Sequence, residues 1–135
     1  MQRVVLDTNV LISALLFKGP TNKLVALWKH NTIVLLASGS IVSEYLRVFS
    51  YPKFGLTPEE IEGLFYNDVL PYIESIHIST TKKVILEDPS DDQFLACALS
   101  GKASALISGD HHLLQLGRYE DIPILTIKQF LDQLR

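Results

Sequence analysis

The chain has 135 residues, of which 47% are hydrophobic and 20% charged, and this composition excludes a disordered or collagen-like protein. The length predicts one compact domain over residues 1–135. Lys and Arg number 12 against 15 Asp and Glu, so the net charge of −3 provides no overall basic field that would attract nucleic acid. A lone cysteine cannot form an internal disulfide, and no apolar stretch reaches the roughly 18 residues of a membrane span, so we expect a soluble cytoplasmic protein with no membrane association.

Segments typical of strands and of helices alternate along the chain. Short apolar runs predict the strands, and apolar residues at helical spacing predict the helices. In chain order we expect a strand over 4–6, helices over 9–17 and 21–30, a strand over 33–37, a helix after the turn at 38–40 that stops at 52, a helix from 57 to about 71, a strand over 75–79, a helix from 89 to 101, a strand over 105–108, a short helix after 110, a strand over 122–125 and a helix from about 128 to 134. The clearest start signal is Thr57 as an N-cap with Glu60 at the capping-box position.

This alternation defines the expected fold class. Short, unbroken apolar strands are typical of a parallel sheet with both faces covered by helices, so the sequence predicts a three-layer α/β/α domain. The strand over 75–79 alternates polar and apolar residues and is expected near a sheet edge. In open sheets of this kind, ligands bind beyond the carboxyl ends of the strands.

Acidic residues gather at those expected strand ends. Asp7 directly follows the first strand, Asp110 follows the fourth, Asp91 and Asp92 open the helix before it, and Glu44 lies early in the helix after the second strand. Each aspartate is individually also a favoured helix N-cap. Together, however, such acids would repel one another unless a cation lay among them. Carboxylate ligands select hard ions such as Mg²⁺ or Mn²⁺, which predicts phosphoryl-transfer chemistry.

The motifs around these acids resemble those of a PIN domain. They are D-T-N-V at 7–10, S-E-Y-L at 43–46, D-D-Q-F-L-A-C-A-L at 91–99 and S-G-D at 108–110. More narrowly, they resemble the PIN-family toxins of type II toxin–antitoxin systems, the virulence-associated protein C-like ribonucleases. The resemblance extends over residues 4 to about 131.

This resemblance implies a flavodoxin-like strand arrangement and a Mg²⁺- or Mn²⁺-dependent endoribonuclease. The positions that match the family's catalytic, metal-binding acids are Asp7, Glu44, Asp91 and Asp110, with Asp92 as the alternative to Asp91. The nucleophile would be water, and the products would carry a 5′-phosphate and a 3′-hydroxyl.

The resemblance also implies contacts around the metal and with partners. Polar positions expected behind the metal ligands are Thr8, Asn9 and Ser108, and candidate substrate contacts are Lys18, Arg47 and His111. His111 and its neighbour His112 point about 100° apart on a helix, so they cannot both reach inward. The implied partners are an RNA substrate, a small antitoxin protein and a second copy of the chain, with the apolar helices around 46–49 and 64–70 as the candidate interface.

Other protein classes share some of these features. A PIN-like module that binds RNA or protein without turnover would show the same acids. A haloacid dehalogenase-type phosphatase needs a second aspartate where Asn9 stands, and a receiver domain needs one where Thr80 and Thr81 follow the third strand. Neither a P-loop nor a G-x-G-x-x-G motif occurs, so nucleotide binding by those routes has no support.

Overall fold

The computed structural model of the chain describes residues 1–78 and 91–134. The elements in chain order are β1 (Gln2–Leu6), α1 (Thr8–Leu16), the 3₁₀ turn η1 (Pro20–Asn22), α2 (Lys23–Lys29), β2 (Ile33–Ala37), α3 (Gly39–Phe49), η2 (Pro52–Phe54), α4 (Pro58–Asp68), η3 (Leu70–Tyr72), β3 (Ile73–Ser75), α5 (Asp92–Ser100), β4 (Ala105–Ile107), α6 (His111–Leu116), β5 (Arg118–Tyr119), β6 (Ile122–Leu125) and α7 (Ile127–Gln133).

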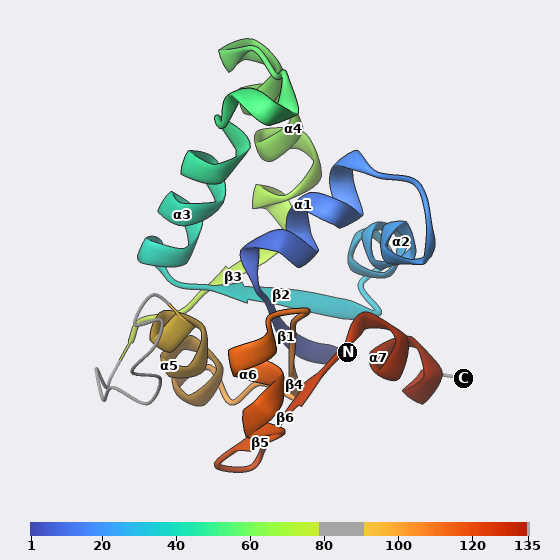
Figure 1. Cartoon of the computed structure of the whole chain (residues 1–135), viewed down its shortest axis with the longest axis vertical. Helices are drawn as coiled ribbons and strands as arrows, with labels where there is room; N and C mark the ends of the chain where they lie inside the picture. Colours follow the sequence, from blue (N-terminus) through green and yellow to red (C-terminus); the bar gives the residue numbers. More distant parts are fainter. Residues whose placement is uncertain (79–90, 135) are drawn as a thin grey trace.

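The described strands form one sheet in the order β3-β2-β1-β4-β6-β5. All neighbouring pairs are parallel except β5 and β6, which are antiparallel. Helices α1 to α4 lie on one side of the sheet and α5 and α6 on the other, while α7 packs against β6 and η1 (Figure 1). The predicted three-layer α/β architecture is confirmed.

The strand order corrects one detail of that expectation. The parallel strands, counted in chain order, run 3-2-1-4-5, whereas a flavodoxin-like sheet runs 2-1-3-4-5. The chain builds β2 and β3 outward from one side of β1 and then crosses back to place β4 on the other side. Alternation of strands and helices predicts a parallel sheet but carries no information about which strands are neighbours. The point at which the strand order reverses consequently lies between β1 and β4, and ligands of open parallel sheets bind near such a point.

The core forms where the sheet meets the two helical layers. The strands β1, β2 and β4 are almost entirely buried, and the helices contribute large side chains such as Trp28 of α2, Phe49 of α3 and Phe94 of α5. The indole N–H of Trp28 donates to the carbonyl of Asp68 at 2.8 Å, which ties α2 to the end of α4. Four aromatic residues of the helices are buried in this core: Trp28, Tyr45, Phe49 and Phe65.

Two strand predictions need correction. The third strand is Ile73–Ser75 rather than 75–79, although it does lie at the sheet edge. Beyond Ser75, the amide of Ile76 donates to the carbonyl of Ala37 in β2 at 3.0 Å, and Ile76 and Ile78 are partly buried against the core. Their alternation therefore reflects packing on the core beyond the end of the strand. The two-residue β5 was not expected, because so short a strand has no sequence periodicity.

The helices agree with the sequence predictions more closely than the strands do. The capping box is confirmed, since Glu60 N–H donates to the Thr57 hydroxyl at 3.1 Å and Thr57 N–H donates to the Glu60 carboxylate at 2.9 Å. The helix expected over 21–30 is divided into η1 and α2. The predicted helix start at Pro89 and Ser90 and the end of the strand expected at Ser79 lie outside the described residues.

No single helix within residues 1–78 and 91–134 has the length and apolar composition to cross a membrane, although Thr8–Leu16 and Pro20–Lys29, bent by 95° to each other, pass that test as a pair.

Candidate metal-binding site

The end of β1 delivers a buried carboxylate. Asp7 caps α1, because its Oδ1 accepts a hydrogen bond from the amide of Val10 at 3.0 Å, and its Oδ2 accepts one from the Ser108 hydroxyl. Its residue exposure is 6%. This burial raises the pKa of Asp7, the charge of Asp110 raises it further, and the hydrogen bonds from Ser108 and the backbone act in the opposite direction.

The end of the neighbouring strand β4 is tied to the same point. The Ser108 hydroxyl accepts the amide hydrogen of Asp110 at 2.9 Å while it donates to Asp7. Asp110 caps α6 through Oδ1, which accepts from the amides of His112 at 2.8 Å and Leu113 at 3.2 Å. Asp7 and Asp110 can therefore each cap a helix and still belong to the group of acids.

Helix α3 supplies Glu44. Its Oε2 accepts a hydrogen bond from the Thr8 hydroxyl, and its Oε1 accepts one from the Gln93 amide at 2.8 Å. Arg47 lies one turn further along α3, with its guanidinium 3.5 Å from the same Oε1. Glu44 is thus held between the first turns of α1 and α5, rather than being a freely solvated helix residue.

Asp91 and Asp92 differ in their positions. Asp91, immediately before α5, is buried and lines the same pocket as Asp7 and Glu44, whereas Asp92 does not line it. Asp91, Asp110 and His112 each offer one ligand atom, and these atoms lie within 4.8 Å of one another. The sequence left open which of the adjacent aspartates faces the site, and the structure brings Asp91 into it.

The acids line one pocket of about 250 Å³ at the carboxyl ends of β1 and β4. Its lining residues are Asp7, Thr8, Asn9, Glu44, Arg47, Val48, Tyr51, Lys53, Asp91, Phe94 and Asp110. Thr8, Asn9 and Arg47 therefore line the same pocket as the acids, and Ser108 hydrogen-bonds Asp7 from behind it.

Not every residue expected near the site lies there, and some residues that do lie there were not expected. Lys18 is exposed beyond the end of α1 and does not line the acidic pocket, and His111 is exposed while His112 reaches the acids. Two residues at the site were not expected from the sequence: Lys53 of η2, which lines the pocket, and Gln93 of α5, which hydrogen-bonds Glu44. Neither residue has a local signal: Gln93 is two residues after Asp91, a helical spacing at which side chains do not share a face, and no sequence pattern places Lys53.

The donor set fits a divalent cation. Carboxylate oxygens from four separate parts of the chain face one small pocket, and oxygen ligands are those that Mg²⁺ and Mn²⁺ bind. A cation there would offset the repulsion between Asp7 and Asp110 that raises the pKa of Asp7.

The fold and this pocket together define a nuclease-like α/β domain with a possible acidic metal-binding group. A family model described as PIN domain matches residues 3–112, so the chain belongs to the PIN domain family. PIN domains are generally nucleases and typically use divalent metal ions. No curated protein matches the chain.

Proposed function

We propose that this PIN domain is a Mg²⁺- or Mn²⁺-dependent endoribonuclease and the toxin of a type II toxin–antitoxin pair. The observation that carries the proposal is the convergence of Asp7, Glu44, Asp91 and Asp110 on one pocket from four distant parts of the chain. A structural role for the acids explains two of them as helix caps, but it does not explain why Glu44 and the buried Asp91 face the same pocket.

The proposed reaction is hydrolysis of an RNA phosphodiester by water. Asp7, Asp91 and Asp110 would hold the cation, with Asp91 favoured over Asp92 because it lines the pocket. A bound divalent cation lowers the pKa of a coordinated water and stabilises charge on the phosphate. Glu44 would accept the water's proton, a role supported by the hydrogen bonds from Thr8 and Gln93 that hold its carboxylate at the same pocket.

Two positively charged side chains at the pocket support the proposal that the substrate is a polyanion. Arg47 and Lys53 both line it, and the exposed Arg47 guanidinium remains 3.5 Å from Glu44. They place positive charge beside the acids although the whole chain is acidic, so we propose that they bind phosphates flanking the cleaved bond. Lys18 is not part of this proposal, because it does not line the pocket.

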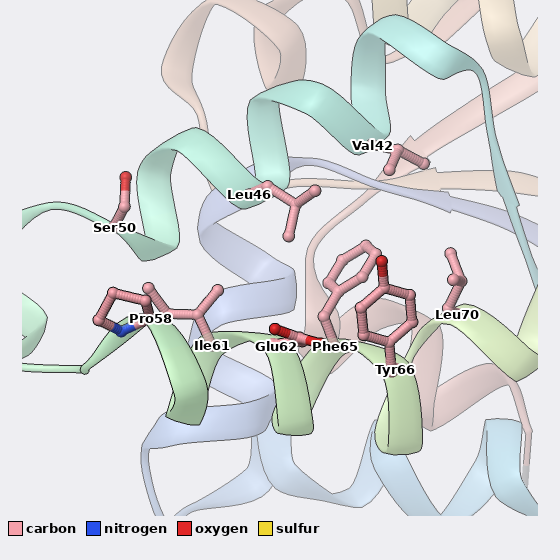
Figure 2. Close-up of a pocket in the computed structure, with 9 residues that line it drawn as sticks. All are labelled: Val42, Leu46, Ser50, Pro58, Ile61, Glu62, Phe65, Tyr66 and Leu70. Atoms are coloured by element: carbon pink, nitrogen blue, oxygen red, sulfur yellow. The ribbon is translucent and has the colours of Figure 1, made fainter.

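An apolar groove between α3 and α4 supports a protein partner. Figure 2 shows Val42 and Leu46 of α3 facing Ile61 and Phe65 of α4 across a pocket of about 500 Å³. Exposed Tyr66 and Leu70 extend it. We propose that an apolar segment of the antitoxin occupies this groove; self-association into a homodimer is the competing outcome.

The partner proposal is tested by co-expressing the chain with the product of the adjacent gene and measuring the mass of the purified complex. The substitution Leu46→Ser should abolish a heteromeric complex without unfolding the protein, because Leu46 is partly exposed. A complex that survives this change, or a homodimer that forms without any second protein and is lost in the variant, would contradict the antitoxin assignment of the groove.

The nuclease proposal is tested by cleavage of single-stranded and structured RNAs with and without Mn²⁺. We expect metal-dependent products with 5′-phosphates, which are lost in Asp7→Asn and retained in Asp121→Asn, a matched change at an exposed turn. Binding of Mn²⁺ without cleavage of any RNA would instead support a PIN module that does not turn over.

A further inference from the structure

A histidine joins the acidic group at the start of α6. One ring nitrogen of His112 lies within 4.8 Å of carboxylate oxygens of both Asp91 and Asp110. Its Nδ1 is 3.8 Å from Asp110 Oδ1, which is too long for a hydrogen bond. The same Oδ1 accepts the amide hydrogen of His112 at 2.8 Å, so the cap itself holds this residue beside the site.

We propose that His112 is a ligand of the divalent cation, together with Asp91 and Asp110, and that its imidazole makes the site prefer Mn²⁺ and Co²⁺ over Mg²⁺. The inference rests on the proposed function, because both place a cation in this pocket. It changes the expected donor set, which the sequence predicted to consist of carboxylates.

The spacing of the ligand atoms is compatible with one shared ion. Two ligands at about 2.1 Å from an octahedral ion lie about 3.0 Å apart when adjacent and about 4.2 Å apart when opposite. The ligand atoms of Asp91, Asp110 and His112 lie within 4.8 Å of one another, close to the separation of opposite ligands. The hydrogen bonds that Asp110 accepts within residues 1–78 and 91–134 are all on Oδ1, so Oδ2 is available to a cation.

The metal preference follows from the chemistry of imidazole. Mg²⁺ takes oxygen ligands in a strict octahedron, whereas nitrogen ligands favour transition ions, with affinity rising from Mn²⁺ to Co²⁺. Each substitution that removes the nitrogen should therefore weaken Co²⁺ and Mn²⁺ more than Mg²⁺.

His111 provides a matched control. It is the adjacent residue on α6, it is exposed, and its ring centroid is 6.0 Å from that of His112 with the ring planes tilted by 56°. It does not belong to the group formed with Asp91 and Asp110. Removing His111 takes one imidazole from α6 in the same way but should leave the cation ligands intact.

The experiment measures dissociation constants of Mn²⁺, Co²⁺ and Mg²⁺ at one fixed pH, by calorimetry on the full chain. Because loss of residues that merely support ligands costs 10- to 100-fold in affinity, His112→Ala should weaken Mn²⁺ and Co²⁺ by at least about tenfold. We expect Mg²⁺ to change by less than about threefold, and His111→Ala to match the wild type for all three ions. His112→Asp should weaken Co²⁺ while it retains Mg²⁺.

A spectroscopic readout tests the ligand directly. Pulsed electron paramagnetic resonance of bound Mn²⁺ should show coupling to a ¹⁴N nucleus in the wild type and in His111→Ala, and none in His112→Ala. The His112 side chain is 41% exposed, so the alanine variant should melt like the wild type in the absence of metal.

The outcomes separate this inference from the nuclease proposal. Absence of ¹⁴N coupling in the wild type, unchanged Mn²⁺ affinity in His112→Ala, or no cation binding at all would overturn the role of His112. Nitrogen-coupled Mn²⁺ binding without RNA cleavage would refute the nuclease and leave the ligand assignment standing. Cleavage that depends on Asp7 but not on His112, with unaltered metal affinities, would refute the ligand assignment alone.

Discussion

The substitution Asp7→Asn separates the structural role of this residue from its proposed chemical role. Asparagine is as good an N-cap as aspartate, and its amide oxygen can accept the Val10 amide hydrogen now 3.0 Å from Oδ1. Its amide nitrogen cannot accept from the Ser108 hydroxyl, but that hydroxyl can turn and accept from the amide instead. Burial raises the pKa of Asp7, so the metal-free wild type loses stability as pH rises from the ordinary aspartate pKa to this raised value. The asparagine variant has no such loss. Without metal it should melt above the wild type at neutral pH, and the difference should shrink in acid.

A bound cation should reverse this order. A ligand at about 100 times its dissociation constant stabilises the folded state by about 2.7 kcal/mol. At about 2.1 cal/mol/K per residue, the unfolding entropy of 135 residues is about 0.28 kcal/mol/K, so the wild type should gain about 10 °C in melting temperature. The asparagine variant should lose most of that gain, because it lacks one anionic ligand.

The assay is thermal melting of both proteins over a pH series, with and without Mn²⁺, alongside RNA cleavage. We expect cleavage by Asp7→Asn to fall by at least about 100-fold, since even indirect perturbation of a metal site costs 10- to 100-fold. Asp121→Asn, at an exposed position, controls for the general effect of removing one negative charge. An asparagine variant that melts below the wild type without metal, or that gains as much from Mn²⁺, would refute the reasoning.

Three further predictions concern packing, a buried hydrogen bond and substrate binding. A Cβ at Gly101 would lie 2.9 Å from Leu36 Cδ1, so Gly101→Ala should cost about 1–3 kcal/mol in urea unfolding, and an unchanged midpoint would contradict this contact. The Tyr45 hydroxyl donates to the Leu6 carbonyl at 2.6 Å in the core, so Tyr45→Phe should cost about 1–2 kcal/mol and lower the melting temperature by about 4–7 °C. A calorimetric scan that shows no shift would count against that hydrogen bond. Lys53→Ala should raise KM for RNA and reduce its salt dependence; an equal effect of Lys18→Ala would remove Lys53 from the substrate contacts.

Local patterns in the sequence were sufficient for the elements and for part of the site. Apolar spacing on α3 buries Ile41, Tyr45 and Phe49 on one face, as four-residue intervals require. Residues that follow a strand directly, such as Asp7, must lie at its carboxyl end, and neighbouring parallel strands bring such ends together. The sequence could therefore predict a parallel α/β class and acids at one edge of the sheet.

Tertiary packing decided what has no local signature. The strand order, the antiparallel β5 and the position of Lys53 depend on contacts between segments far apart in the chain. The sequence also could not show which of two adjacent, identical residues faces the site. Asp91 rather than Asp92 lines the pocket, and His112 rather than His111 reaches the acids. The sequence by itself determined which kinds of side chain stand at the strand ends, because periodicity is local. Only the tertiary structure decided which of them meet, because adjacent residues point in different directions, about 100° apart on a helix, and packing between distant segments sets which one faces the site.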